Sequence, residues 1–333
     1  KDKSRGMRLV RNICFMLLHI LVCVSCNQVP VFNISATLSS PIPNGGLSCA
    51  TACAFNGKGY IFGGRTQNGN YTNDLWEYNP QTNSWKLISH LLGKARVNAI
   101  MVSDGEALYI GLGFSKGSVY VDSCYLQDFW RFTPDDGQWE QLQSYPSTNT
   151  IRGVPYVSDQ SIYIACGTGW SHTNELTRYD ITTNQWTIVN AHQSRIDARF
   201  SAAGATCGGH HFFGTGLNGK NTCQWYEVDL ANDEWHIRSE IPGKGRTLCA
   251  YCATDEYVYL FGGRYFAGEH TGGEVFNDHM RYNVLKDCWE YCSTMPCGRA
   301  ENMIAFTIDG KVYYGLGENE KGQLINTLYQ IEE

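Results

Sequence analysis

Arginine is the residue type whose spacing in this chain points most clearly to chemistry. Five arginines stand 15 or 16 residues before a glycine pair that closes an apolar run: Arg96, Arg152, Arg199, Arg246 and Arg299. Guanidinium groups that converge on one place would hold a carboxylate or another anion, because each offers several donors in a planar fork. Alternatively, each arginine donates to carbonyl groups of its own scaffold and needs no ligand. The sequence leaves both interpretations open for any single arginine.

Aromatic and charged residues directly follow several of the glycine pairs. They are Arg65, Phe114, Trp170, Arg264 and Glu318. Trp170, with His172 two residues later, has the flat face that stacks on a sugar ring. The glycine-rich insertion at 264–277 carries Glu269, His270 and Glu274, which suit acid–base work but also an ordinary solvated loop.

Other candidate sites carry less weight. Cys288, Cys292 and Cys297 are spaced irregularly for zinc, and no paired cysteine framework is evident. We therefore predict no metal and no cofactor. The formal net charge of −6 gives no basic surface for nucleic acid.

The elements that would position these residues repeat six times along the chain. Glycine pairs begin at residues 63, 111, 167, 214, 262 and 315, with spacings of 48, 56, 47, 48 and 53 residues. Tryptophans follow five of them, at Trp85, Trp139, Trp186, Trp235 and Trp289. Each unit holds short apolar strands separated by turn residues, as a four-stranded propeller blade requires. The glycines allow close approach of the next blade, and the tryptophans fill the space between blades.

This pattern resembles the Kelch repeat over essentially all of 30–333. We predict an all-β fold, a single six-bladed Kelch-type β-propeller with blades at roughly 45–89, 93–143, 151–190, 197–239, 243–293 and 297–333. The last unit ends before any tryptophan strand. We expect Val31–Ile34 to supply its outer strand and close the ring.

Blade geometry places the candidate residues on one face. The first strand of each blade is innermost, so its start and the end of the second strand reach the same face of the disc. We therefore expect up to seven arginines around one mouth of the central channel, where they would focus a positive potential.

The N-terminus predicts export. Residues 1–25 combine a positively charged start with an apolar run from Ile13 to Val24, which is too short to span a bilayer. Cys26 after Ser25 is the predicted lipidation site, and ordinary cleavage near Ser25 is the alternative. The expected location is the periplasm or outer membrane of a Gram-negative-type bacterium, with a lipid anchor as the sole membrane contact.

The expected function is binding of an acidic sugar, glycan or acidic peptide at the arginine-rich mouth by a monomer. Related Kelch domains grip acidic peptides at this position. The alternative is a sialate mutarotase, which the chain resembles in export, blade number and Gly317-Glu318. That resemblance implies Glu318 as acid–base, Glu301 in reserve, and Arg246 and Arg299 as carboxylate anchors. The remaining hypotheses are a protein-interaction scaffold and a copper radical oxidase.

Overall fold

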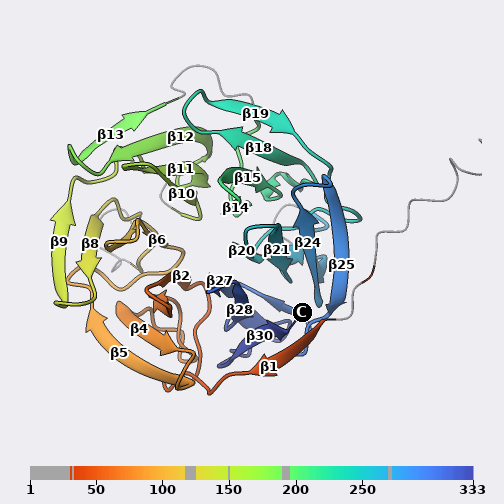
Figure 1. Cartoon of the computed structure of the whole chain (residues 1–333), viewed down its shortest axis with the longest axis horizontal. Coiled ribbons are helices and arrows are strands. Elements are labelled where there is room, and N and C mark those ends of the chain that lie inside the picture. Colours follow the sequence, from red (N-terminus) through yellow and green to blue (C-terminus); the bar gives the residue numbers. More distant parts are fainter. Residues whose placement is uncertain are drawn as a thin grey trace, which may run out of the picture.

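The computed structural model describes residues 31, 34–116, 125–148, 151–189, 196–268 and 272–332. Within these ranges the chain forms strands, turns and bends, and no helix there is long and apolar enough to cross a membrane. The predicted signal segment, Cys26, Glu269 and His270 lie outside the described residues. Six four-stranded antiparallel sheets stand around a central axis as blades (Figure 1). The predicted all-β, six-bladed propeller is confirmed.

The first five blades each take their strands in chain order from the axis outward. Blade 1 contains β2 (Thr51–Phe55), β3 (Lys58–Phe62), β4 (Asp74–Asn79) and β5 (Ser84–His90). Blade 2 contains β6 (Ile100–Ser103), β7 (Leu108–Gly111), β8 (Phe129–Thr133) and β9 (Gln138–Leu142). Blade 3 contains β10 (Val154–Ser158), β11 (Ser161–Thr168), β12 (His172–Asp180) and β13 (Gln185–Ile188). Blade 4 contains β14 (Ala203–Cys207), β15 (His210–Gly214), β18 (Trp225–Asp229) and β19 (Glu234–Ile237). Blade 5 contains β20 (Ala250–Ala253), β21 (Tyr257–Phe261), β24 (Asp278–Asn283) and β25 (Cys288–Thr294).

Blade 6 joins the two ends of the chain. Its order is β27 (Ile304–Ile308), β28 (Lys311–Gly315), β30 (Leu328–Glu332) and β1 (Ser35–Leu38). An N-terminal strand therefore closes the ring, as predicted, but it lies four residues later than the expected Val31–Ile34. Val31 instead makes an isolated parallel bridge with Tyr291 of blade 5.

Three short two-stranded ladders complete the described strands. Two follow the second strand of their blade, and the third pairs the segment before the first strand of blade 6 with the segment after its second strand. They are β16 (Leu217–Asn218) with β17 (Lys220–Asn221), β22 (Arg264–Tyr265) with β23 (Glu274–Val275), and β26 (Ala300–Glu301) with β29 (Glu318–Asn319). These ladders extend the blades at the face where the innermost strands begin.

The glycine pairs let one blade dock on the next. Gly262 has φ of 54°, and a Cβ there would lie 2.3 Å from the carbonyl oxygen of Ala300 in blade 6. The neighbouring Gly263 donates its N–H to the same carbonyl at 2.9 Å. A side chain at Gly262 would break this approach, because backbone cannot yield as a flexible side chain does.

Four of the five repeated tryptophans donate a hydrogen bond to the preceding blade of the ring. Trp139 of blade 2 packs against Phe132 with ring centroids 4.6 Å apart, and its indole N–H donates to Ser89 Oγ of blade 1 at 2.8 Å. Trp289 of blade 5 donates likewise to the carbonyl of Ser239 after blade 4. The apolar core is accordingly divided into clusters that lie between neighbouring blades.

Candidate functional site

The mouth of the channel is formed by the residue that precedes each innermost strand by one or two positions. These six residues, called the mouth here, are Cys49, Asn98, Arg152, Ser201, Leu248 and Asn302, all with φ between 54° and 59°. This left-handed conformation is unfavourable for residues other than glycine. Backbone hydrogen bonds from blade to blade hold it in place: Asn98 donates to Cys49 at 2.9 Å, Cys49 to Asn302 at 3.2 Å and Asn302 to Leu248 at 2.9 Å.

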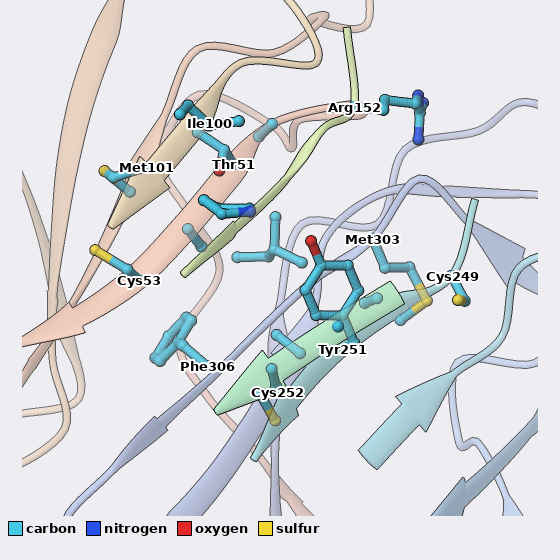
Figure 2. A pocket seen from close by; sticks show the side chains of 18 of the residues that line it. Thr51, Cys53, Ile100, Met101, Arg152, Cys249, Tyr251, Cys252, Met303 and Phe306 are labelled. Carbon is cyan, nitrogen blue, oxygen red and sulfur yellow. The ribbon is translucent and has the colours of Figure 1, made fainter. Parts of the chain in front are cut away.

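A cavity of about 350 Å³ extends from the mouth along the innermost strands (Figure 2). Its walls are mainly small and apolar side chains, among them Ala50, Ala99 and Ala250. Figure 2 shows the ring of Tyr251 among the cavity-lining side chains. Burial raises the pKa of Tyr251, so its hydroxyl stays protonated at neutral pH. Among the described residues that line the cavity, Arg152 alone is charged at neutral pH.

Arg152 reaches across the mouth to three other blades. Its Nη2 donates to Asn302 Oδ1 of blade 6 at 2.5 Å and to Cys49 Sγ of blade 1 at 3.4 Å, and its Nη1 donates to Ser201 Oγ of blade 4 at 3.3 Å. Blade 6 lies opposite blade 3 in the ring, so the side chain spans the channel axis (Figure 1). All three partners are neutral, and the guanidinium charge is left uncompensated by them.

Three of the predicted arginines do not face the mouth. Arg96, Arg199 and Arg246 are at most 1% exposed and belong to the walls between strands. Arg96 donates to both oxygens of Asp128, at 2.8 and 2.7 Å, and to the carbonyl of Leu112. Burial alone would raise the pKa of Asp128, but the bonds and charge of Arg96 outweigh it and hold the pKa below its usual value. The structure therefore does not bring these three to the mouth, because their donors serve the scaffold.

The equivalent contacts of the other two buried arginines follow the same plan. Arg246 donates to Asp278 at 3.0 and 3.1 Å and to the carbonyl of Gly262. Arg199 donates to Gln224 Oε1 at 2.8 Å and to the carbonyl of Thr215. Arg246 is therefore not placed to anchor a ligand carboxylate at the mouth, the role that was expected for it.

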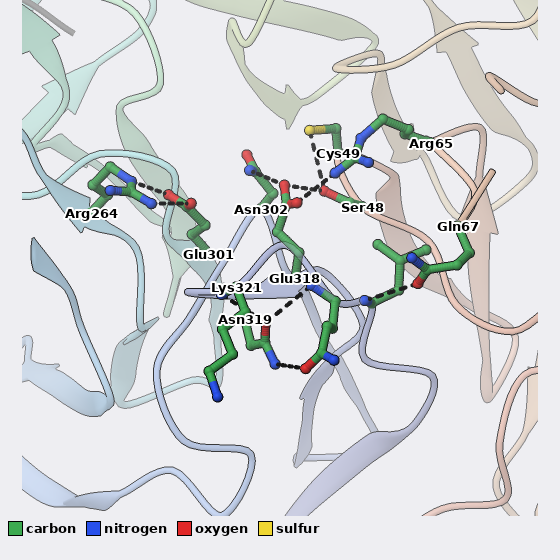
Figure 3. A network of polar contacts seen from close by, with 12 residues as sticks. Ser48, Cys49, Arg65, Gln67, Arg264, Glu301, Asn302, Glu318, Asn319 and Lys321 are labelled. Atoms are coloured by element: carbon green, nitrogen blue, oxygen red, sulfur yellow. Dashed lines mark hydrogen bonds and ion pairs between the residues drawn. The ribbon is translucent and has the colours of Figure 1, made fainter. Parts of the chain in front are cut away.

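The remaining arginines are paired with carboxylates. Arg65 Nη2 lies 2.5 Å from Glu318 Oε2, and Arg264 holds Glu301 by two bonds of 2.7 and 2.6 Å (Figure 3). Arg299 contacts Glu274 at 3.5 Å and Glu320 at 3.8 Å and donates to the carbonyl of Val275, away from the mouth.

Glu318 lies beside the mouth and is held by three donors. Besides Arg65, Ser48 Oγ donates to its Oε1 at 2.8 Å and Asn302 Nδ2 does so at 2.9 Å (Figure 3). Asn302 therefore connects Glu318 with Arg152 through the two ends of one amide. Glu301, bound by both nitrogens of Arg264, is 7% exposed and is not placed to act as a reserve base.

The predicted aromatic residues Phe114 and Trp170 belong to a row on the side of blades 1 to 3 that also contains Tyr71 and Tyr125. The ring centroids of Tyr71 and Phe114 are 6.5 Å apart, those of Phe114 and Tyr125 5.7 Å, and those of Tyr125 and Trp170 5.5 Å. Trp170 is 76% exposed. His172 bonds with Thr168 Oγ1 at 2.9 Å and packs on Phe200.

The sequence reasoning missed the neutral residues of the mouth. In the described part of the chain the side-chain amide of Asn98 has no hydrogen-bond partner, and it lines the cavity next to Arg152. Superposing the six repeats would have found Asn98, Ser201 and Asn302, because they occupy the position of Arg152 in their own blades. Among the described residues, no group of three or more histidine, cysteine or acidic side chains is placed to hold a metal ion.

Comparisons with known proteins agree with the propeller fold. A family model described as the KLHDC2/KLHL20/DRC7 Kelch-repeats domain matches residues 17–216, and a Kelch motif matches 245–296. Kelch-like protein 35 of Mus musculus is 22% identical over 77% of this chain, which spans 40% of that protein. An N-acetylneuraminate epimerase of Haemophilus influenzae is 28% identical over 43% of this chain and 34% of its own length. The solved structure of YjhT matches with a TM-score of 0.73 at 15% identity, covering 89% of this chain and 99% of that one.

Proposed function

The chain belongs to the Kelch-repeat proteins, and we propose that its propeller binds an anionic ligand, with an acidic sugar as the preferred class, at the mouth of the channel. The proposal rests on Arg152. Six of the seven predicted arginines have a carboxylate partner or are buried in the blades. Arg152 lies at the axis with neutral partners only, beside a cavity. A carboxylate arriving there would form charge-assisted hydrogen bonds, which are stronger than the neutral ones it replaces.

The groups around Arg152 favour a sugar acid over a simple anion. Asn98, Ser201 and Asn302 offer amide and hydroxyl groups, which suit sugar hydroxyls because each can donate and accept. Relatives that share part of the chain are named N-acetylneuraminate epimerases. N-acetylneuraminate carries a carboxylate and several hydroxyl groups, so its chemistry fits this set of side chains.

The alternative within the same site is catalysis of ring opening of such a sugar. Glu318 is the residue predicted for this role, and it pairs through the backbone with Glu301, the residue directly before Asn302 of the mouth. Its two oxygens already accept three hydrogen bonds, which favours a positioning role over proton transfer. NMR measurement of anomer exchange in N-acetylneuraminate with the intact chain distinguishes the two: a rate above the uncatalysed one supports the enzyme, and an unchanged rate supports binding alone.

The binding proposal is tested with Arg152→Asn and Arg152→Lys. Asparagine suits the backbone of this position, because Asn98 and Asn302 adopt the same φ of 55° in their blades. We expect Arg152→Asn to weaken binding of N-acetylneuraminate or glucuronate by roughly tenfold to a hundredfold in calorimetry, because a hydrogen bond to a charged group contributes about 1.5–3 kcal/mol. Arg152→Lys should retain part of the affinity.

Arg178→Asn is the matched control. Arg178 lies on β12 of the same blade, 44% exposed and paired with Asp180, so its loss should leave the affinity unchanged. If Arg152→Asn binds the sugar acids as well as the unaltered chain, the proposed site is wrong. If no sugar acid binds the unaltered chain, the preferred ligand class is wrong and the scaffold reading gains support.

A further inference from the structure

We infer that the anion site continues outward over Trp170, so that the ligand is an acidic oligosaccharide whose charged residue lies at Arg152 and whose next residue stacks on the indole. This inference rests on the proposed function and specifies its substrate class. It starts from an exposed aromatic side chain that the scaffold does not use.

Trp170 differs from the tryptophans of the repeat. Those indoles pack between blades, and Trp139 and Trp289 donate their N–H groups to the preceding blade. Trp170 stands at the tip of the turn between β11 and β12, and 76% of it is exposed. An exposed indole offers a large flat face at low cost in side-chain entropy, which is why such residues concentrate in binding sites.

The position of Trp170 is tied to that of Arg152. Ile151, directly before Arg152, pairs with Thr168 through two backbone hydrogen bonds of 2.9 and 3.0 Å. Trp170 follows Thr168 by two residues. One residue from Arg152 to Ile151, one interstrand spacing and two residues from Thr168 to Trp170 separate the two positions by about 15 Å at most along the backbone. That distance is more than one pyranose ring covers, and it suits a second residue of a chain.

The indole is also fixed in place by its neighbours. Tyr125 of blade 2 contacts it edge-to-face, with centroids 5.5 Å apart and planes at 64°. Phe114 contacts Tyr125 in turn at 5.7 Å, and its backbone pairs with Val97, the residue before Asn98 of the mouth. A ring held in one orientation loses little freedom on binding, so stacking contributes more to affinity.

The chemistry of this row favours sugar over an acidic peptide. Stacking on a neutral aromatic face requires a flat array of C–H groups, which pyranose rings present on one side. Asn98, whose carbonyl accepts from the N–H of Arg152 at 3.4 Å, lines the same cavity, and its side-chain amide suits a hydroxyl group. The test includes a peptide so that the choice is decided by measurement.

Calorimetry of the intact chain compares N-acetylneuraminate with 3′-sialyllactose, and galacturonate with trigalacturonate. We expect at least one trisaccharide to bind about tenfold more tightly than its single acidic residue, since its second sugar would add a stacking contact with the indole. Trp170→Ala should remove this advantage and leave the affinity for the single residue within about twofold. Arg152→Asn should weaken both.

The control is Ile237→Ala, which removes an equally exposed apolar side chain, 79% exposed, from β19 and should change neither affinity. Equal affinities of trisaccharide and single residue in the unaltered chain would overturn the extended site while the anion site stands. So would a Trp170→Ala variant that weakens both ligands alike. Tighter, Trp170-dependent binding of pentaglutamate than of any sugar would assign the site to a peptide. If the unaltered chain binds none of these ligands, the proposed function itself is refuted.

Discussion

At the scale of single residues, one amino-acid type serves three purposes in this molecule. Arg96 and Arg246 are buried in bidentate pairs that hold strands together, Arg65 and Arg264 join carboxylates of the neighbouring blade 6, and Arg152 faces the cavity. Each of the five lies near a glycine pair, so its distance from the pair in sequence does not show which purpose it serves. The difference is an offset of two residues. Arg152 occupies in blade 3 the position that Asn98 occupies in blade 2, whereas Arg96 lies two residues before that position. The side chain consequently points to a different neighbour.

His279 leads to a prediction about pH. It is 2% exposed in β24 and stacks on Phe261 at 5.5 Å, and burial lowers its pKa from 6.5 to about 4. Asp278 opposes this shift and Arg281 adds to it. Because the unfolded chain binds the proton at higher pH than the folded one, the stability supported by neutral His279 is complete above pH 6.5 and is lost as the pH falls toward 4. Urea denaturation should show a loss of about 2 kcal/mol from this group between pH 7 and pH 5.

The variant His279→Phe should remove that part of the pH dependence, because phenylalanine keeps the stacking contacts and does not titrate. His236→Gln, at an exposed histidine in β19, is the control and should leave the slope unchanged. A His279→Phe variant with the full slope of the unaltered chain would show that other groups cause it.

At the scale of elements, much of the fold was predictable because the signals were repeated. The glycine pairs and tryptophans identified every blade, since close approach between blades allows few other residues at those positions. The closing strand was misplaced because β1 carries little pattern: Ser35, Thr37 and Leu38 are exposed, and Val31 looked like a better strand residue. Its place is set by backbone pairing with β30, where Ser35 lies opposite Glu332 and Leu38 opposite Tyr329. A register that is set by backbone pairing leaves no periodic side-chain pattern in the sequence.

That register gives a prediction about ring closure. Neighbouring residues in an antiparallel strand alternate in donating to the partner, so Ala36→Pro with Thr37→Pro removes a donor to β30 whichever of them is bonded. We expect the double variant to lower the midpoint of thermal unfolding by several degrees. Ala36→Val with Thr37→Val is the control, since it alters the same side chains but favours a strand. A proline variant as stable as this control would show that β1 contributes little to closure.

At the scale of the whole molecule, the candidate site lies where the ring is joined. At this seam the chain runs from blade 6 to blade 1 only by way of β1, which is held to the rest of blade 6 by its strand pairing with β30. Gly317 donates to Leu47 there, Cys49 donates to Asn302, and Arg65 pairs with Glu318. The backbone connections and the mouth are therefore coupled, because Asn302 belongs to both. This coupling could not be predicted from the sequence, since Ser48 and Glu318 are 270 residues apart.

Removing the seam pair should loosen the ring locally. In Glu318→Gln the oxygen that accepts from Ser48 and Asn302 is kept while Arg65 loses its counter-charge, and Arg65→Met completes a double-mutant cycle. We expect a coupling of about 1 kcal/mol, because both side chains are partly exposed. Hydrogen exchange measured by mass spectrometry should rise in β2 and β27 more than in β20, since β2 and β27 are the innermost strands on the two sides of the seam. The matched pair, Arg264→Met with Glu301→Gln, lies between blades 5 and 6, which are covalently continuous, and should not raise exchange in β2. Equal exchange in β2 for the two pairs would contradict a local opening at the seam and would indicate that the ring opens as a single cooperative unit.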